Sequence, residues 1–433
     1  MKLVFFWRCV RLVLLLCLTS IAAANAETVA VSSAAPVAPA GSAPAGSASA
    51  IAPSSAVRPS IASAVAPAPQ EFWLPSEKPS GNALNDRVWV AFYEPAVPSG
   101  ERIPAVVLLH YLGSRDSVEM RAFARYLAAR GVASAVMTLP YHGKRLSPGD
   151  RPLNHFVPTR PETAVQAFGQ SASDVSTVVT WLVNRPDVDA RRVGIAGISL
   201  GAIVTHLAMG LDNRLTAGVA MLGAGDLPEI YRGSVVGKYF FHANPSLLNE
   251  DAVAQLRVVD PLTYADRNRP RHVLMIEAAR DSFVPPRAAE HLWKALGRPP
   301  IQWIDTNHPA LALVPRQAMR VTLSYLQSVW NAPAGESSTR KDGAGVPHIW
   351  VPTIKVGTIF GLDSVATPAI QLQAFSFATR RDHMSLLHAD IGMTGRGPFV
   401  GLAATINQYI DAGLGRRFNG RKIRPYLSVH IVF

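Results

Sequence analysis

Between about residue 72 and residue 332, short apolar runs alternate with segments whose apolar residues recur at helical spacing. The expected strands are residues 106–109, 133–139, 193–196, 217–222, 272–276 and 301–304. The expected helices are residues 117–129, 162–184, 200–209, 287–296 and 316–330. Strands that alternate with long helices predict βαβ units. The fold class is therefore α/β, with a doubly wound, mostly parallel sheet between two layers of helices.

From residue 348 onward the helical period disappears and apolar residues occupy alternate positions. The alternation is clear in residues 354–360, 387–393, 400–406 and 427–433. It predicts a small C-terminal antiparallel β segment with one apolar face. The strands, and the terminal Phe433, resemble those of outer-membrane β-barrels, but residues 348–433 supply only about four to six strands of typical length. Either several chains pool their strands in one barrel, or the segment is a soluble sheet that packs on protein.

The first 26 residues resemble a secretory signal peptide. Lys2, Arg8 and Arg11 precede an apolar stretch, and a small-residue cleavage pattern ends at Ala26. Residues 27–69, rich in Ala, Pro and Ser, predict a linker, as do residues 333–347. These boundaries leave the α/β domain at residues 70–332 and the β segment at 348–433. We expect export across the inner membrane, to the periplasm or outside, with possible outer-membrane association.

Composition excludes several classes of function. The formal net charge is +12, but the charges are scattered and form no basic run, so we expect no nucleic-acid partner. Cys9 and Cys17 both lie within the signal peptide. The mature chain therefore has no disulfide, no cysteine nucleophile and no thiolate metal site. We expect neither cofactor nor metal.

One strand end carries a nucleophile motif. Gly197-Ile198-Ser199-Leu200-Gly201 stands between an expected strand and an expected helix. A Gly-x-Ser-x-Gly sequence in this position predicts a tight, strained turn that exposes the serine at a helix N-terminus. A serine that only caps the helix would not explain both glycines. We therefore predict that Ser199 is a nucleophile.

A serine nucleophile needs a base, and the base needs an acid that orients it. Asp281 and His308 follow the ends of the next suitable strands, in the chain order Ser, Asp, His. Glu277 lies too close to the end of its strand, and Asp305 precedes the histidine on the same loop, so both are weaker candidates for the acid. Backbone donors for an oxyanion are expected at Leu200 and Leu112, with Tyr111 as the second choice for the latter.

These residues resemble an α/β-hydrolase of the dienelactone-hydrolase and esterase branch over about residues 85–332. The matching pieces are His110-Tyr-Leu-Gly113, Leu139-Pro-Tyr-His142-Gly143, the Ser199 motif, Asp260-Pro-Leu-Thr-Tyr264, Asp281 and His308. Tyr111 replaces the glycine that is usual in the family. Dienelactone hydrolases use cysteine, whereas the serine here favours ordinary esters. The resemblance implies acyl transfer to water through an acyl-enzyme, without cofactor or metal.

Two insertions, residues 144–159 and about 225–258, are expected to form a cap that selects the substrate, a small-molecule ester. The first contains Arg145, Pro148, Arg151, His155 and Phe156, and the second contains Tyr231, Tyr239, Phe240, Phe241 and His242. The aromatic side chains of the second either contact an apolar acyl group or only pack the cap. His142 either lines the pocket or ties its loop to backbone. A serine peptidase, or an inactive envelope-anchored binding protein, remains an alternative. The linker also predicts that the catalytic domain works without residues 348–433, which we expect to mediate membrane association or self-assembly.

Overall fold

The computed structural model describes residues 68–96, 100–157, 160–235, 237–238, 248–269, 271–332, 346–351, 353–363 and 365–432. The expected signal peptide, nearly all of the first linker and most of the second lie outside these residues. So do four candidate cap contacts, Tyr239, Phe240, Phe241 and His242.

An eight-stranded sheet forms the centre of the catalytic domain. Its strands are β1 (Gln70–Pro75), β2 (Arg87–Tyr93), β3 (Ile103–Leu109), β4 (Ala133–Met137), β5 (Val188–Ile198), β6 (Ala217–Met221), β7 (His272–Ala278) and β8 (Ile301–Ile304). Their spatial order is β1-β2-β4-β3-β5-β6-β7-β8. The pairs from β4 to β8 are parallel, and β1 and β2 form an antiparallel edge. The predicted mostly parallel sheet is confirmed.

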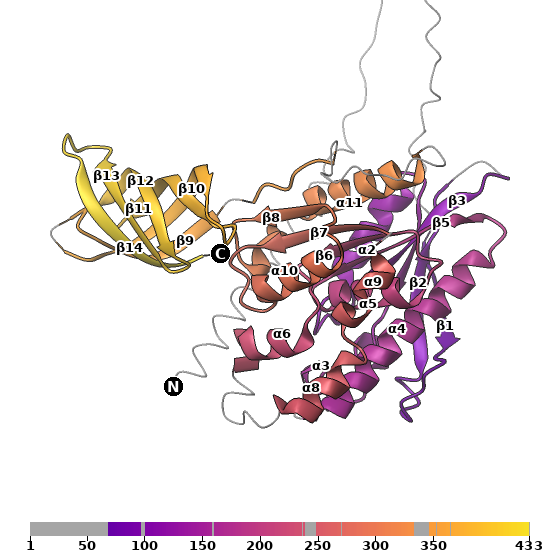
Figure 1. Cartoon of the computed structure of the whole chain (residues 1–433). Helices are drawn as coiled ribbons and strands as arrows, with labels where there is room; N and C mark the ends of the chain where they lie inside the picture. Colours follow the sequence, from indigo (N-terminus) through magenta and orange to yellow (C-terminus); the bar gives the residue numbers. More distant parts are fainter. Residues whose placement is uncertain are drawn as a thin grey trace, which may run out of the picture. The chain divides into compact units, whose positions relative to one another are not determined.

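Helices cover both faces of this sheet (Figure 1). The longer ones are α2 (Val118–Ala128), α4 (Pro161–Val183), α5 (Leu200–Leu211), α10 (Pro286–Ala295) and α11 (Pro315–Trp330). Successive strand residues point to opposite faces, so neighbours such as Val107 and Leu108 enter different cores. One core contains the apolar faces of α4, α5 and α10, and the other contains those of α2 and α11. The parallel strands are thus buried on both sides, which explains their continuous apolar runs.

The C-terminal segment forms a closed antiparallel barrel within a single chain. Its strands are β9 (Thr353–Phe360), β10 (Thr367–Thr379), β11 (Ser385–Thr394), β12 (Gly397–Asn407), β13 (Ile410–Arg417) and β14 (Arg424–Val432). β9 pairs with both β10 and β14 and so closes the ring. The expected antiparallel β segment is confirmed, and no pooling of strands between chains is needed to close it.

Glycines in the strands make room inside the six-stranded barrel for two aromatic side chains. A Cβ at Gly392 would lie 2.3 Å from the Phe399 ring, and one at Gly401 would lie 2.6 Å from the Tyr426 hydroxyl. The two aromatic rings therefore occupy space that side chains at these glycines would take. Together with Ile359, Leu362, Ala369 and Ala403 they form a small apolar cluster inside the barrel.

Strong periodicity predicts most elements, but four strands are not among the expected ones. They are β1 and β2 at the antiparallel edge of the sheet, and β10 and β13 in the barrel. β10 alternates regularly from Thr367 to Gln373 and has register shifts only after Gln373, whereas β13 has glycine at Gly413 and Gly415. Among the residues that the structure describes, no helix combines the length and apolar composition that crossing a membrane requires.

Candidate active site

Ser199 lies between the end of β5 and the first residue of α5, with backbone angles φ +55° and ψ −115°. Positive φ is unfavourable for a residue with a Cβ, so the turn is strained and must be held by its surroundings. The Ser199 amide donates to Met221 O at 2.8 Å, and its carbonyl accepts from Ala202 N at 2.9 Å. These bonds fix the serine to β6 and to the first turn of α5. The predicted tight turn between strand and helix is present.

The two glycines of the motif let the helix approach the sheet. A Cβ at Gly197 would lie 2.2 Å from Gly201 O, inside the helix backbone. A Cβ at Gly201 would lie 2.4 Å from Leu109 O and 2.8 Å from His110 O. The first turn of α5 therefore lies directly against the end of β3. This contact brings the Ser199 turn next to the loop that contains Leu112.

The structure brings Ser199, Asp281 and His308 together. His308 Nε2 lies 2.9 Å from Ser199 Oγ, and His308 Nδ1 lies 2.6 Å from Asp281 Oδ2. The other Asp281 oxygen accepts from the amides of Phe283 and Val284, each at 2.8 Å. The Asp281 side chain is almost fully buried, whereas His308 is 15% exposed. Each residue follows a parallel strand (β5, β7 or β8), so all three meet at the carboxyl edge of the sheet.

The two rival acids lie elsewhere. Glu277 is buried within β7, where burial and the neighbouring Asp281 carboxylate raise its pKa well above the usual value. Asp305 accepts from Arg280 Nε at 2.7 Å, from the Ser385 amide at 2.9 Å and from Gln373 Nε2 at 3.1 Å. His308 Nδ1 contacts Asp281 instead of either of these carboxylates.

The loop expected to bind an oxyanion is held by two neutral histidines. His110 Nδ1 donates to Tyr111 O at 2.9 Å, and His110 Nε2 accepts from Leu139 N at 3.0 Å. His142 Nδ1 donates to Pro140 O at 2.8 Å, and His142 Nε2 accepts from Gly113 N at 3.0 Å. Burial lowers the pKa of His110 to about 4 and that of His142 well below its usual value. His142 therefore ties its loop to backbone, the second of the two roles considered for it.

Leu112, the predicted donor, lies in the turn that this pair holds. Ser114 N donates to Tyr111 O at 3.3 Å across the turn, and Gly113 has φ +85°. Leu200, the other predicted donor, is the first residue of α5, where an amide has no acceptor within its own helix. Tyr111, the second choice, is 36% exposed.

The two insertions contact each other, because the Tyr231 hydroxyl donates to Phe156 O at 2.6 Å. Arg145 is fully buried and forms an ion pair with Asp174 at 2.7 Å, so it stabilises the fold. His155 stacks on Tyr141 with ring centroids 3.5 Å apart. The carboxylate of Asp260 accepts from the amides of Asp226, Leu227 and Leu262, at 2.7 to 2.9 Å. The resemblance pointed to Asp260 but gave it no role.

Barrel residues hold the loop that carries His308. Asp305 binds Gln373 and Ser385, and Thr353 Oγ1 donates to Asp305 O at 2.6 Å. Arg280, next to Asp281, donates to Gln408 O at 3.3 Å, and Asn307 Nδ2 donates to Val432 O. Catalytic domain and barrel belong to one compact unit. Sequence reasoning missed these contacts, because no local pattern links residues 48 to 128 positions apart.

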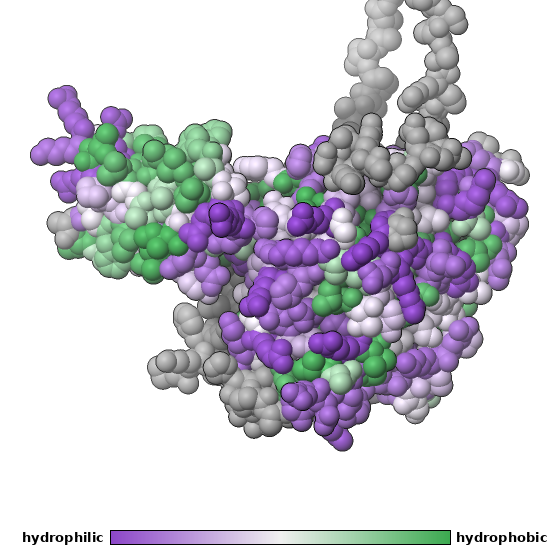
Figure 2. Space-filling view, in the orientation of Figure 1, coloured by the Kyte–Doolittle hydropathy of each residue, from purple (hydrophilic) through white to green (hydrophobic). Residues whose placement is uncertain are grey.

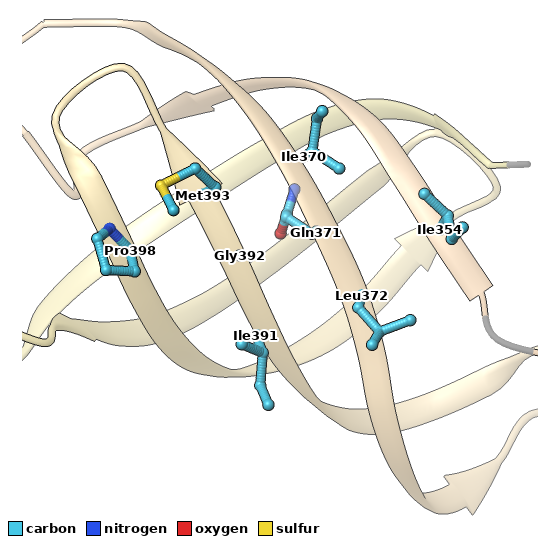
Figure 3. A pocket seen from close by; sticks show the side chains of 8 residues that line it. All are labelled: Ile354, Ile370, Gln371, Leu372, Ile391, Gly392, Met393 and Pro398. Carbon is cyan, nitrogen blue, oxygen red and sulfur yellow. The ribbon is translucent and has the colours of Figure 1, made fainter.

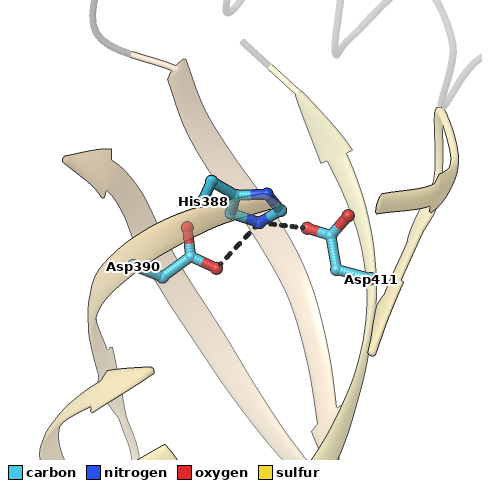
Figure 4. Close-up of side chains that lie close together, drawn as sticks. All are labelled: His388, Asp390 and Asp411. Atoms are coloured by element: carbon cyan, nitrogen blue, oxygen red, sulfur yellow. Dashed lines mark ion pairs between the residues drawn. The ribbon is translucent and has the colours of Figure 1, made fainter. Parts of the chain in front are cut away.

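One cluster has the residue types of a metal site. His388, Asp390 and Asp411 lie inside the barrel, with candidate ligand atoms within 4.8 Å of one another (Figure 4). The Lys355 ammonium, however, lies 2.7 Å from Asp411 Oδ2, 3.2 Å from Asp390 Oδ1 and 2.7 Å from His388 Nε2. It takes the position of a bound cation, so these side chains fit an ion-pair network better than a metal.

Comparison with known proteins gives one family match. The model of the prolyl oligopeptidase family matches residues 166–309, less than half of the chain, and this range includes Ser199, Asp281 and His308. No curated protein matches the chain.

Similar solved structures include peptidases and esterases. The acylaminoacyl peptidase of Pyrococcus horikoshii is 17% identical, with a TM-score of 0.48, over 63% of this chain and 44% of that one. An esterase of Pyrococcus furiosus is 18% identical, with a TM-score of 0.43, over 60% and 92%. Acetyl xylan esterase 1 of a Thermoanaerobacterium species is 16% identical, with a TM-score of 0.47, over 61% and 89%. The chain thus spans less than half of the length of the Pyrococcus horikoshii peptidase.

Strand order, helix placement and the Ser199 turn together give the catalytic domain an α/β-hydrolase fold. The family match supports a serine hydrolase.

Proposed function

We propose that the chain hydrolyses carboxylic esters of small molecules through Ser199, His308 and Asp281. The observation that carries the proposal is the continuous hydrogen-bonded series from Ser199 Oγ through both ring nitrogens of His308 to Asp281. In this arrangement the histidine can remove the hydroxyl proton while the carboxylate stabilises the imidazolium that forms.

In the proposed reaction, Ser199 Oγ attacks the ester carbonyl carbon as its proton passes to His308 Nε2. The tetrahedral intermediate collapses, the C–O bond to the alcohol breaks, and His308 returns the proton to the leaving oxygen. Water then attacks the acyl-enzyme by the same route and releases the acid and free Ser199. The Leu200 and Leu112 amides would donate to the oxyanion, a contribution usually worth about 10²- to 10³-fold in kcat for each donor.

A serine peptidase is the second candidate, and the match to the prolyl oligopeptidase family favours it. The same three residues can cleave amides, because only the leaving group differs. We prefer ester hydrolysis because the chain resembles dienelactone hydrolases but has serine where they have a cysteine nucleophile, and this serine favours ordinary esters. We also propose that the chain is exported, on the basis of its first 26 residues.

A substrate panel tests the proposal. The full chain is assayed with nitrophenyl esters of increasing acyl length and with blocked peptide nitroanilides, beside the Ser199→Ala variant. We expect turnover of the esters, and a loss of about 10⁶-fold in kcat in the variant because attack and proton transfer are lost together.

An organophosphorus probe, read by mass spectrometry, should label Ser199 and leave the alanine variant unlabelled. Turnover of peptides in preference to esters would favour the peptidase. Labelling or ester turnover that persists in the alanine variant would show that another group reacts.

A further inference from the structure

We infer that the C-terminal barrel inserts into a lipid bilayer, with its wall in the hydrocarbon layer and its basic end at anionic headgroups. This inference concerns residues 353–432 and does not rest on the proposed esterase activity.

The barrel wall is apolar in the outward direction, and its inward side chains are mostly polar apart from the small apolar cluster around Phe399 and Tyr426. Along β14, Leu427, Val429 and Ile431 point outward and are 38%, 40% and 60% exposed, while Ser428 and His430 are buried. A barrel that is stable in water has the reverse arrangement, because burial of apolar surface stabilises its interior. The alternation is that of a membrane barrel, whose lipid-facing residues are apolar.

The apolar surface runs around the whole barrel. Each of the six strands carries at least one large apolar side chain that is more than a third exposed: Val356 and Phe360 on β9, Ile370 and Leu372 on β10, Ile391 and Met393 on β11, Val400 and Leu402 on β12, Leu414 on β13, and Val429 and Ile431 on β14. Figure 2 shows green apolar patches on the visible side of the barrel, with paler residues between them and purple residues at its ends. A protein partner would cover one side of such a ring. A bilayer surrounds it.

A close view of the wall shows the same character. Ile354, Ile370, Leu372, Ile391, Met393 and Pro398 line a shallow groove of about 390 Å³ across β9, β10, β11 and the start of β12 (Figure 3). Gly392 and Gln371 also line the groove, but the Gln371 side chain is fully buried and its Nε2 donates to Ser428 Oγ at 2.5 Å. The groove therefore has an almost purely apolar lining, which suits acyl chains and offers little to a polar ligand.

The charged residues of the six strands lie inside the barrel or at strand ends, and not on the outer surface of the wall. Lys355, Asp390 and Asp411 are buried inside the barrel, where they pair with one another. The other charged strand residues, Arg416, Arg417 and Arg424, lie at strand ends. The closed ladder also satisfies the backbone without an exposed edge, as spanning a bilayer requires.

The strand lengths fit a bilayer. The six strands have 8 to 13 residues, with 10 in β11 and 11 in β12 but only 8 in β9 and in β13. At about 3.3 Å per residue and the usual tilt of about 40°, ten residues reach roughly 25 Å along the barrel axis. That is about the height of the apolar band of an outer-membrane barrel.

One end of the barrel is strongly basic. Arg396, Arg416, Arg421, Lys422 and Arg424 are all exposed in or beside the β11–β12 and β13–β14 turns. The third turn at this end holds Asp363, which forms an ion pair with Arg417. Five exposed cations remain, at the level where an inserted barrel would meet lipid phosphates.

Vesicle flotation tests the inference. The full chain, purified in mild detergent, is mixed with phosphatidylcholine vesicles containing phosphatidylglycerol, freed of detergent, and floated after a salt and alkali wash. We expect the chain to float with the vesicles. Val429→Arg and Leu402→Arg should lower the vesicle partition coefficient by roughly 30-fold or more, because Arg on the lipid face at the bilayer midplane is strongly unfavourable.

Val258→Arg is the matched control, because Val258 is 59% exposed on the catalytic domain and should tolerate the same charge without effect on flotation. Circular dichroism checks that each variant is folded, independently of any esterase activity. The inference is overturned if the full chain remains unbound, or if the wall variants float as well as the parent chain. It is also overturned if the chain forms a defined oligomer without lipid that Val429→Arg dissociates, because copies of the chain would then cover the wall.

A second comparison tests the basic end. The triple variant Arg421→Gln, Lys422→Gln and Arg424→Gln should lose about fivefold in partition per removed charge with anionic vesicles and little with neutral ones. Equal losses on both kinds of vesicle would show that these cations do not meet anionic headgroups.

Discussion

The nucleophile is held in a conformation that its own side chain disfavours. Ser199 has positive φ, and backbone strain of this kind typically costs about 1–3 kcal/mol. The cost is offset by bonds from its backbone to Met221, Ala202 and Ile203. Because those partners lie on β6 and α5, the serine cannot relax without moving both elements. The packing of β6 and α5 therefore maintains the strained conformation, and this conformation keeps the Ser199 hydroxyl directed at His308.

The assignment of the acid predicts unequal effects of two similar substitutions. Asp281→Asn should lower kcat for a small ester by about 10⁴-fold, because His308 would lose the partner that fixes its tautomer. Asp305→Asn breaks a buried ion pair with Arg280 that helps to hold the His308 loop, so it should lower stability and cost at most about 10²-fold in kcat. Steady-state kinetics on both variants gives the comparison. If Asp305→Asn were the more damaging, the series through Asp281 would not be the reacting one.

The buried histidines predict a loss of stability in mild acid. Burial holds the pKa of His110 at about 4, below its ordinary 6.5, so between these values the unfolded chain binds the proton and the folded chain does not. The free energy of unfolding should therefore have its full value above about pH 6.5 and decrease as the pH falls towards 4. This group should account for a decrease on the order of 3 kcal/mol. Urea unfolding at several pH values measures it. His110→Gln should flatten the slope in this window, and an unchanged slope would contradict the assignment.

The helices and turns that could be predicted from the sequence are those that periodicity or a local motif encodes. The helices α4, α5 and α11 begin within one residue of their predicted starts, because their apolar stripes are long and regular. The Ser199 turn was predictable because its glycines and serine are adjacent in the chain. The Arg280–Asp305 pair and the barrel contacts were not, since they depend on tertiary packing between distant segments.

The close approach of α5 to β3 predicts that Gly201 cannot be replaced. A methyl group in Gly201→Ala would meet Leu109 O, a backbone atom that cannot rotate away. The helix start or the oxyanion loop must move, so kcat should fall by about 10²- to 10³-fold, as when one oxyanion donor is lost. Gly218→Ala is the control, because its nearest atoms, 3.3 Å away, belong to the flexible Met209 side chain. If the two variants had equal kcat values, the position of the oxyanion loop would not affect catalysis.

The two parts of the chain expose different kinds of surface. The catalytic domain buries apolar residues on both faces of its sheet, whereas the barrel exposes them on all six strands. The period-two pattern predicted an apolar face but not that the strands would close, because closure depends on the pairing of β9 with the distant strand β14. The linker suggested two independent parts, yet hydrogen bonds join the barrel to the histidine loop.

These bonds change what removal of the barrel should do. The linker alone predicts near-normal turnover without residues 340–433. However, Asp305, Asn307 and Arg280 all bond to barrel residues and lie within a few positions of His308 or Asp281. A loop freed from such contacts can displace His308 by about 1 Å, which can cost on the order of 10²-fold in rate. We therefore expect the truncated chain to fold, to react with an organophosphorus probe more slowly, and to lose kcat by about 10- to 100-fold with little change in KM. Circular dichroism and steady-state kinetics on the full and truncated chains measure this. Full turnover in the truncated chain would show that the sheet alone positions the histidine, and that the barrel acts only on where the enzyme resides.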